Sequence, residues 1–157
     1  MTTGILRGIW ISSTARDPLV CIAEVRVVPG RGLEGDRYFF ACGSFSRWPG
    51  KGREVSLIAE EALEAVRSEH GIDLREGRSR RNLVTSGIVL ADLQERTFRI
   101  GTAVFRGIRP CAPCEYLERI TEAGVFEALK GRGGLRADVI EEGILHVGDA
   151  IEVLAGS

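Results

Sequence analysis

Two closely spaced cysteines, Cys111 and Cys114, are the residues best suited to chemistry in this sequence. They lie in the segment Arg109-Pro-Cys-Ala-Pro-Cys-Glu-Tyr-Leu117, where Cys114 follows a proline and precedes a stretch of helical composition. The amides of a helix N-terminus and a nearby cation such as Arg109 both favour thiolate over thiol. Because the thiolate attacks sulfur and ligates soft metals, the segment predicts nucleophilic sulfur chemistry or a metal ligand. The alternative is that both side chains only fill a core beside a turn.

A closed zinc site and a thioredoxin-like redox site both fit this cysteine pair poorly. Structural zinc generally takes four ligands in two close pairs, but the remaining cysteines, Cys21 and Cys42, lie far apart in different kinds of segment. A thioredoxin-like motif stands near a βαβ pattern, whereas this pair comes late in a region rich in strands. Disulfide exchange between Cys111 and Cys114 stays an open alternative.

The elements that must position these cysteines are short strands punctuated by glycine. A glycine-rich loop at 29–37 suits close backbone approach. Asp36 is expected to fix its turn by hydrogen bonds, and the alternative is that it accepts from Arg37 or Arg81. Helical composition marks 59–70, 115–120 and 125–130. Apolar and β-branched runs indicate strands at 4–12, 20–28, 55–58, 88–93, 98–100, 102–108, 137–140, 144–147 and 150–154. Many short strands with few helices predict a β-barrel.

Length and composition limit the class of protein. The chain has 157 residues and no linker or repeat, so we expect one domain over 1–157. A formal charge of −1 lacks the basic footprint of a general nucleic-acid binder. No apolar run approaches the ~18 residues of a membrane span, and the N-terminus lacks the pattern of a secretory signal. We therefore expect a cytoplasmic protein that binds neither nucleic acid nor membrane.

A series of motifs in a fixed order makes this sequence similar to the MOSC domain, the β-rich module at the C-terminus of molybdenum-cofactor sulfurases and in small free-standing bacterial proteins. The resemblance spans most of the chain and implies a mainly β fold, a pyruvate-kinase-like β-barrel with peripheral helices. The motifs are Gly32-Leu-Glu-Gly-Asp-Arg37, Arg53-Glu-Val-Ser-Leu-Ile58, Arg81-Asn-Leu-Val-Thr85 with Gly87, Pro113-Cys114 with Leu117, and Gly134-Leu-Arg-Ala through Gly148-Asp149.

The resemblance also implies roles for single residues. Cys114 matches the family cysteine that carries sulfur as a persulfide or ligates molybdenum in the cofactor, and Cys111 would release that sulfur through a disulfide or shape the pocket. The anionic pterin phosphate of the molybdenum cofactor needs hydrogen-bond donors. For each arginine an ion pair or a solvated side chain is the alternative. For Asn82 the alternatives are hydrogen bonds that hold a loop and orientation of a substrate. The candidate cofactor-binding residues are Arg37, Arg53, Arg81, Asn82, Arg109 and Arg136.

Partners and reaction class follow from what the sequence lacks. It has no aminotransferase-like region for pyridoxal phosphate, so a sulfur carrier here needs a separate pyridoxal-phosphate-dependent cysteine desulfurase as donor. Molybdopterin or a molybdoenzyme is the expected partner in cofactor handling, and reductase activity would need partner proteins for electrons. Whether the chain is an enzyme, for sulfur transfer or as a molybdenum-dependent reductase component, stays open. The alternatives are a non-catalytic anion-binding or cofactor-binding barrel and a CxxC thiol-disulfide reductant.

Overall fold

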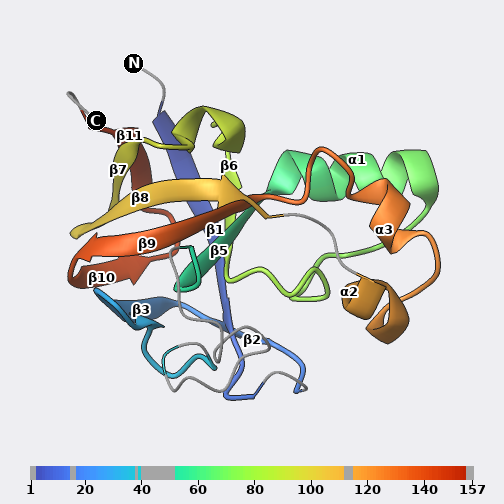
Figure 1. The fold of residues 1–157 in the computed structure, drawn as a ribbon, viewed down its shortest axis with the longest axis horizontal. Coiled ribbons are helices and arrows are strands. Elements are labelled where there is room, and N and C mark those ends of the chain that lie inside the picture. Colours follow the sequence, from blue (N-terminus) through green and yellow to red (C-terminus); the bar gives the residue numbers. More distant parts are fainter. Residues whose placement is uncertain (1–2, 15–16, 38, 40–51, 112–114, 155–157) are drawn as a thin grey trace.

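The computed structural model describes residues 3–14, 17–37, 39, 52–111 and 115–154, and the structural statements below concern these residues. Strands form the body of the molecule and the α-helices lie to one side of it (Figure 1). The helices are α1 (Glu60–His70), α2 (Glu115–Ile120), α3 (Val125–Ala128) and the 3-10 helix η1 (Leu90–Leu93). The strands are β1 (Thr3–Ile11), β2 (Val20–Ile22), β3 (Glu24–Val28), β4 (Gly32–Leu33), β5 (Val55–Ala59), β6 (Leu83–Ser86), β7 (Thr97–Ile100), β8 (Ala103–Pro110), β9 (Leu135–Glu141), β10 (Gly143–His146) and β11 (Ala150–Val153).

Seven of the described strands close into a barrel in the order β1, β11, β7, β8, β9, β5, β6 and back to β1. β5 and β6 run parallel with α1 between them in the chain, and the other neighbours in the barrel are antiparallel. Closure depends on β1 and β11, where Thr3 lies opposite Glu152. Outside the ring, β2 extends β1, and β10, β3 and β4 form a second sheet. The predicted mainly β barrel with peripheral helices is confirmed.

Strand alternation divides the apolar residues between two cores. Val55 and Leu57 of β5 belong to the barrel interior, where the rings of Phe98 and Phe105 stack with centroids 5.6 Å apart. Ile58 points the other way and packs against the helices. The second core fills the space between the barrel wall and the helices with Leu63, Val66, Ile72, Leu74, Leu117, Val125, Ala128 and Leu129.

Two expected strands differ from the structure. The run 88–93 is not a strand but contains η1, in which Leu90 and Leu93 are both buried. Leu90 and Leu93 are three residues apart, the spacing at which side chains of a 3-10 helix lie on the same side. Apolar composition alone had indicated a strand here, and that prediction was wrong. The run 20–28 is two strands: β2 pairs with β1, whereas β3 pairs with β10 and β4. The helix expected at 59–70 is confirmed as α1, which ends at Gly71 in the left-handed conformation.

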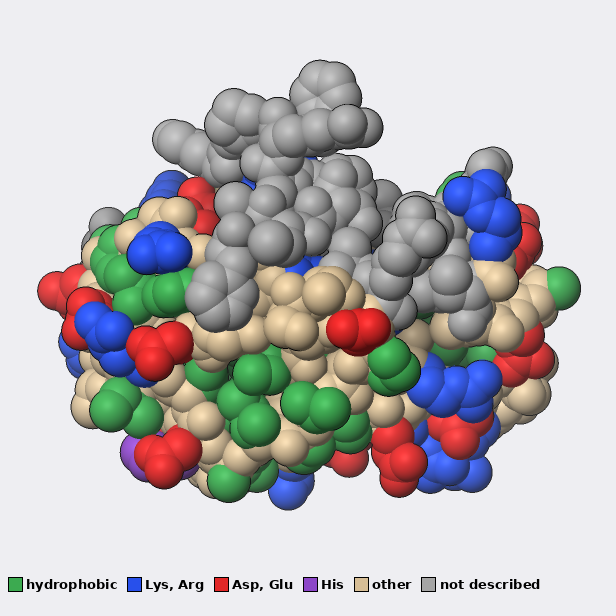
Figure 2. All heavy atoms as spheres, turned by 90° about the horizontal axis from the view of Figure 1, so that it is seen from below, with side chains coloured by type: hydrophobic (Ala, Val, Ile, Leu, Met, Phe, Trp, Pro, Cys, Tyr) green, Lys and Arg blue, Asp and Glu red, His purple; other side chains and the backbone are tan. Residues whose placement is uncertain are grey.

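The surface carries both signs of charge. Figure 2 shows acidic and basic side chains interspersed on one face, with no field of a single sign among the coloured residues. Within the described ranges, no helix has the length and apolar character needed to cross a bilayer.

Candidate functional site

A buried polar row crosses the outer face of the barrel wall. In β5 the side chains of Val55 and Leu57 face the interior, so alternation turns Ser56 outward, yet Ser56 is only 2% exposed. Asn82, at the start of β6, lies beside it and is fully buried. Buried polar groups generally need hydrogen-bond partners, and the contacts between these two residues supply them.

Asn82 ties three barrel strands together with its side-chain amide. Its Oδ1 accepts hydrogen bonds from the backbone N–H of Ser56 at 3.2 Å and from Ser56 Oγ at 3.2 Å. Its Nδ2 donates to the carbonyl of Trp10 at 3.1 Å, and the backbone N–H of Asn82 donates to Ser56 Oγ at 3.1 Å. These bonds join β1, β5 and β6, so the structure places Asn82 as a residue that positions the strands. Its predicted contact with a cofactor stays a prediction.

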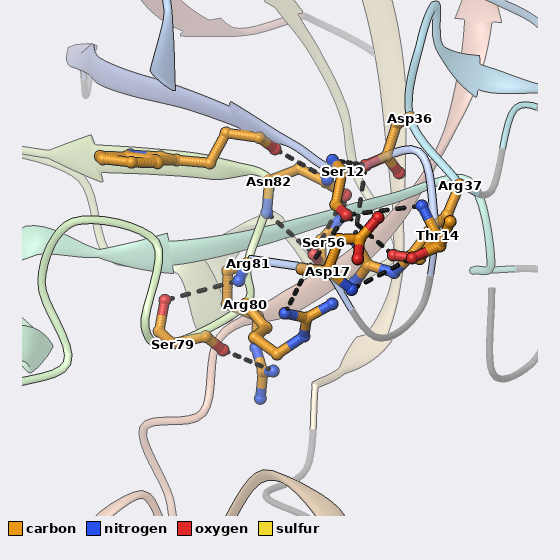
Figure 3. A network of polar contacts seen from close by, with 11 residues as sticks. Ser12, Thr14, Asp17, Asp36, Arg37, Ser56, Ser79, Arg80, Arg81 and Asn82 are labelled. Carbon is orange, nitrogen blue, oxygen red and sulfur yellow. Dashed lines mark hydrogen bonds and ion pairs between the residues drawn. The ribbon is translucent and has the colours of Figure 1, made fainter. Parts of the chain in front are cut away.

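Asp36 and Arg37 form a second buried group at the end of β1. The Asp36 carboxylate accepts from the backbone N–H of Ser12 at 3.0 Å and lies 3.4 Å from Nη1 of Arg37. The backbone N–H of Arg37 donates to the carbonyl of Ser12 at 2.6 Å. Both side chains are at most 5% exposed. Asp36 therefore joins the turn after β4 to the end of β1 and also contacts the Arg37 guanidinium, so it makes a backbone contact and an arginine contact together (Figure 3).

Arg81 differs from Arg37, the other buried arginine of the described residues, in its hydrogen bonds. Nε donates to the carbonyl of Gly133 at 2.9 Å and Nη1 donates to the carbonyl of Ser79 at 3.2 Å. Nη2 is buried and has no hydrogen-bond acceptor within the described part of the chain. In Figure 3 the Arg81 guanidinium points away from Asp36 and Ser12, toward Ser79. A buried cationic donor without an acceptor is costly, which makes this position suited to an anion.

Two further arginines extend the polar row across β9 and β8. Arg136 is the register partner of Ser56 on one side and of Arg109 on the other. Directly opposed residues in a sheet project from the same face, so Arg109, Arg136 and Ser56 share one side of the wall. Arg53 precedes β5 by two residues and is partly buried. The sheet thus brings Arg109 and Arg136 side by side, while Arg37 belongs to the turn after β4.

The cysteine segment begins where β8 and β9 end their pairing. Cys111 is 3% exposed, and its backbone N–H donates to the carbonyl of Gly134 at 2.8 Å. Arg81 holds Gly133, the residue next to Gly134. Cys114, the predicted nucleophile and molybdenum ligand, lies outside the described residues, as does Cys42. Cys21 is an exposed thiol on β2. Among the described residues, no cluster of three or more His, Cys, Asp and Glu suits a metal ion.

Glu54, next to Arg53, is an acidic residue that sequence reasoning did not single out. Its Oε1 accepts from the backbone N–H groups of Gly30 at 2.9 Å and Val139 at 3.1 Å. Burial raises the pKa of the Glu54 carboxyl above its usual value, and the neighbouring Asp138 carboxylate adds to the increase. Ser56 was also missed as a single residue, although one serine within the apolar run Val55–Ile58 signals a buried polar contact.

The profile of one protein family matches residues 46–152, which is more than half of the chain, and that family is the MOSC domain. This chain belongs to the MOSC domain family. The family is associated with the handling of molybdenum cofactor. The motifs that carried the resemblance therefore led to the correct family.

Solved structures share the fold of this MOSC domain. The YuaD protein from Bacillus subtilis superposes with a TM-score of 0.79 at 19% identity, and the match covers 96% of this chain and 95% of that one. YiiM from Escherichia coli gives a TM-score of 0.66 at 18% identity over 98% and 71% of the two chains. YiiM from Geobacillus stearothermophilus gives 0.66 at 17% identity over 96% and 73%. No curated protein matches this sequence.

The residues of this MOSC domain fit an anionic group such as the phosphate of a molybdenum-bearing pterin. The fit rests on Arg81, whose buried Nη2 has no acceptor among the described residues. Arg109 and Arg136 lie near the same end of the β8–β9 pair, where the Cys111–Cys114 segment begins. Guanidinium groups bind phosphate through paired, charge-assisted hydrogen bonds. When bound, the cofactor would supply a molybdenum centre for redox or sulfur chemistry.

Proposed function

We propose that this MOSC domain carries sulfur, or handles the molybdenum cofactor, through Cys114. The single observation that supports the proposal most strongly is the arginine arrangement at the end of the β8–β9 pair. Arg109 and Arg136 share a face of the wall, and Arg81 is bonded to Gly133 beside the backbone of Cys111. A cation-rich approach to a cysteine stabilises its thiolate and attracts an anionic partner.

The sulfur-transfer step needs no oxidant. The Cys114 thiolate attacks the terminal sulfur of a donor persulfide, a new sulfur–sulfur bond forms on Cys114, and the old one breaks to release the donor as thiolate. The two electrons of the broken bond leave with the donor sulfur. The donor would be a separate pyridoxal-phosphate-dependent cysteine desulfurase, and the acceptor molybdopterin or a molybdoenzyme. A reducing compartment such as the cytoplasm would keep the cysteines as thiols.

The residues of this chain have distinct parts in the proposal. Arg109 and Arg136 bind the anionic group, and Arg81 offers Nη2 to it while its other nitrogens hold the backbone near Gly133. Asn82 keeps β5 and β6 in register beneath this site. Cys111 is nearly buried, so its part is to fill the wall at the end of β8.

Mass spectrometry of the intact protein tests the sulfur reaction. The chain is incubated with a cysteine desulfurase and L-cysteine, and one added sulfur atom is expected on Cys114. Cys114→Ser should lose the increment, whereas Cys21→Ser, which alters an exposed thiol on β2, should keep it. Retention of the full increment by Cys114→Ser would show that Cys114 is not the acceptor.

Molybdenum and pterin content of the protein, purified from a host that makes the cofactor, tests the second branch. Arg136→Gln should lower both, while Arg99→Gln, on the exposed side of β7, should leave both unchanged. If Cys114→Ser keeps metal and pterin in full but Arg136→Gln loses them, the domain is a non-catalytic binding module. If neither sulfur nor cofactor is held by the unaltered chain, the proposal is wrong.

A further inference from the structure

A cleft of about 660 Å³ adjoins the end of the β8–β9 pair. Its described walls are the start of α1, the loop into η1 and the facing ends of β8 and β9, with Cys111 among the lining residues. No residue of the buried group of Ser56, Asn82, Asp36 and Arg37 lines it. The volume falls within the range of small-molecule sites in proteins, about 300–1,000 Å³.

The cleft is lined mainly by apolar side chains. Ile88 and Leu90 form its inner part and are nearly buried, while Pro110 contributes from the end of β8. Val89 stands at the rim and is 60% exposed. Covering an exposed apolar side chain at the rim of an apolar cleft removes apolar surface from water, which favours binding of a ligand.

The two charged side chains at the cleft already have partners. Glu61 accepts a hydrogen bond from the backbone N–H of Gly87 at 2.8 Å. Arg132 donates through Nε to the carbonyl of Ala128 at 2.8 Å and forms an ion pair with Glu69 at 3.2 Å. Arg132 is thus ion-paired, and Glu61 is a negative side chain exposed to solvent, so the described lining offers an anionic ligand no unpaired cation. An anion would therefore lose solvation without gaining a counter-ion.

The wall formed by the loop before β9 is fixed in place. Gly134 has φ +108°, and a Cβ there would overlap the carbonyl of Leu57, so the loop sits directly on β5. Its carbonyl accepts from the N–H of Cys111, and the neighbouring Gly133 carbonyl accepts from Arg81. A ligand would therefore meet a wall that is already ordered, which lowers the entropic cost of binding.

We propose that this cleft binds a neutral, predominantly apolar organic molecule, in contact with Cys111. The ligand buries Val89 and the inner leucine and isoleucine, and the backbone of the glycine-rich loop at 131–134 provides its polar contacts. The inference is independent of the sulfur and cofactor proposal, because it depends on no property of Cys114.

Fluorescence titration with phenylnaphthylamine, a neutral apolar probe, tests the inference on the full chain. Saturable one-to-one binding is expected, with enhanced fluorescence. The sulfonated analogue anilinonaphthalene sulfonate has the same ring skeleton and an added negative charge, so we expect it to bind at least about tenfold more weakly. Equal or tighter binding of the sulfonate would overturn the choice of a neutral ligand.

Val89→Asp and Val20→Asp form a matched pair for locating the probe. The two valines are 60% and 57% exposed, and only Val89 lines the cleft. Val89 is the N-cap of η1, a position that favours aspartate, so folding should be preserved. We expect Val89→Asp to weaken the probe by about tenfold or more and Val20→Asp to change its affinity by less than about twofold.

Ala91→Trp gives an independent check, because it fills the cleft from the exposed side of η1. It should reduce binding of phenylnaphthylamine as Val89→Asp does. If the unaltered chain shows no saturable binding, or if both cleft variants bind as well as Val20→Asp, the inference is wrong. The persulfide increment on Cys114 should be unaffected by Val89→Asp, so the two proposals fail separately.

Discussion

Replacing Asn82 by alanine tests whether this side chain holds the barrel wall together. Asn82 is fully buried, and its amide serves the backbone N–H of Ser56, the Ser56 hydroxyl and the carbonyl of Trp10. The Ser56 hydroxyl hydrogen can rotate, but the Ser56 N–H is left buried without this acceptor, and the Trp10 carbonyl loses a donor. Each such loss costs about 1–3 kcal/mol.

We therefore expect Asn82→Ala to lower the free energy of unfolding by about 2–4 kcal/mol. For a chain of this size that corresponds to a fall of roughly 4–16 °C in Tm. Urea and thermal unfolding followed by circular dichroism measure both quantities. Ser68→Ala is the control, because Ser68 lies on the exposed side of α1 and bonds only within the helix, to Ala65. Ser68→Ala should change the free energy of unfolding by no more than about 0.5 kcal/mol.

A double-mutant cycle with Ser56→Ala isolates the contact between the two residues. Since the Ser56 hydroxyl donates to Asn82 Oδ1 at 3.2 Å, a bond that either substitution removes, the two substitutions should be non-additive by about 1 kcal/mol. A change below about 0.5 kcal/mol for Asn82→Ala, or strict additivity in the cycle, would refute the assignment of Asn82 as the residue that joins the strands.

Two further predictions concern stability. Gly134→Ala should lower the free energy of unfolding by about 3 kcal/mol or more, because its Cβ would overlap the Leu57 carbonyl. Gly131→Ala, in open space at φ +76°, should lower it by about 1 kcal/mol. Equal urea midpoints for the two variants would contradict this prediction. Burial raises the pKa of Glu54, so its contribution to stability is lost as pH rises from the usual ~4.3 through the raised value. Glu54→Gln, which can still accept from the backbone and can donate to Asp138, should equal or exceed the stability of the unaltered chain at pH 7 and flatten its pH dependence; a clear loss at pH 7 would disprove the assignment.

Local signals in the sequence were sufficient for much of the fold. Helix α1 follows from early acidic residues, apolar positions at helical spacing and Gly71 at its end. The run 88–93 misled because composition alone does not separate a strand from a 3-10 turn, although the spacing of Leu90 and Leu93 carried the distinction. The split at Ala23 depends on which distant strand each half meets, and no local pattern contains that information.

The sequence offers candidate site residues by their type and motif, whereas the connections between them could not be predicted from it. Arg81 and Asn82 stood out together in one motif, but their partners Gly133 and Trp10 lie 52 and 72 residues away in the chain. The side-by-side placement of Arg109 and Arg136 depends equally on the register of two strands. Sequence reasoning can name such residues, while their pairing appears only when the sheet is assembled.

The pairing of β1 with β11 has a consequence for biosynthesis. The strand that begins at Thr3 emerges from the ribosome long before Ala150–Val153, its neighbour in the ring, has been translated. During that interval β1 exposes an open edge to other nascent chains and to chaperones. Completion of the barrel must follow the exit of β11 from the ribosomal tunnel, and the closing step joins strands that are far apart in the sequence, so it is expected to be slow.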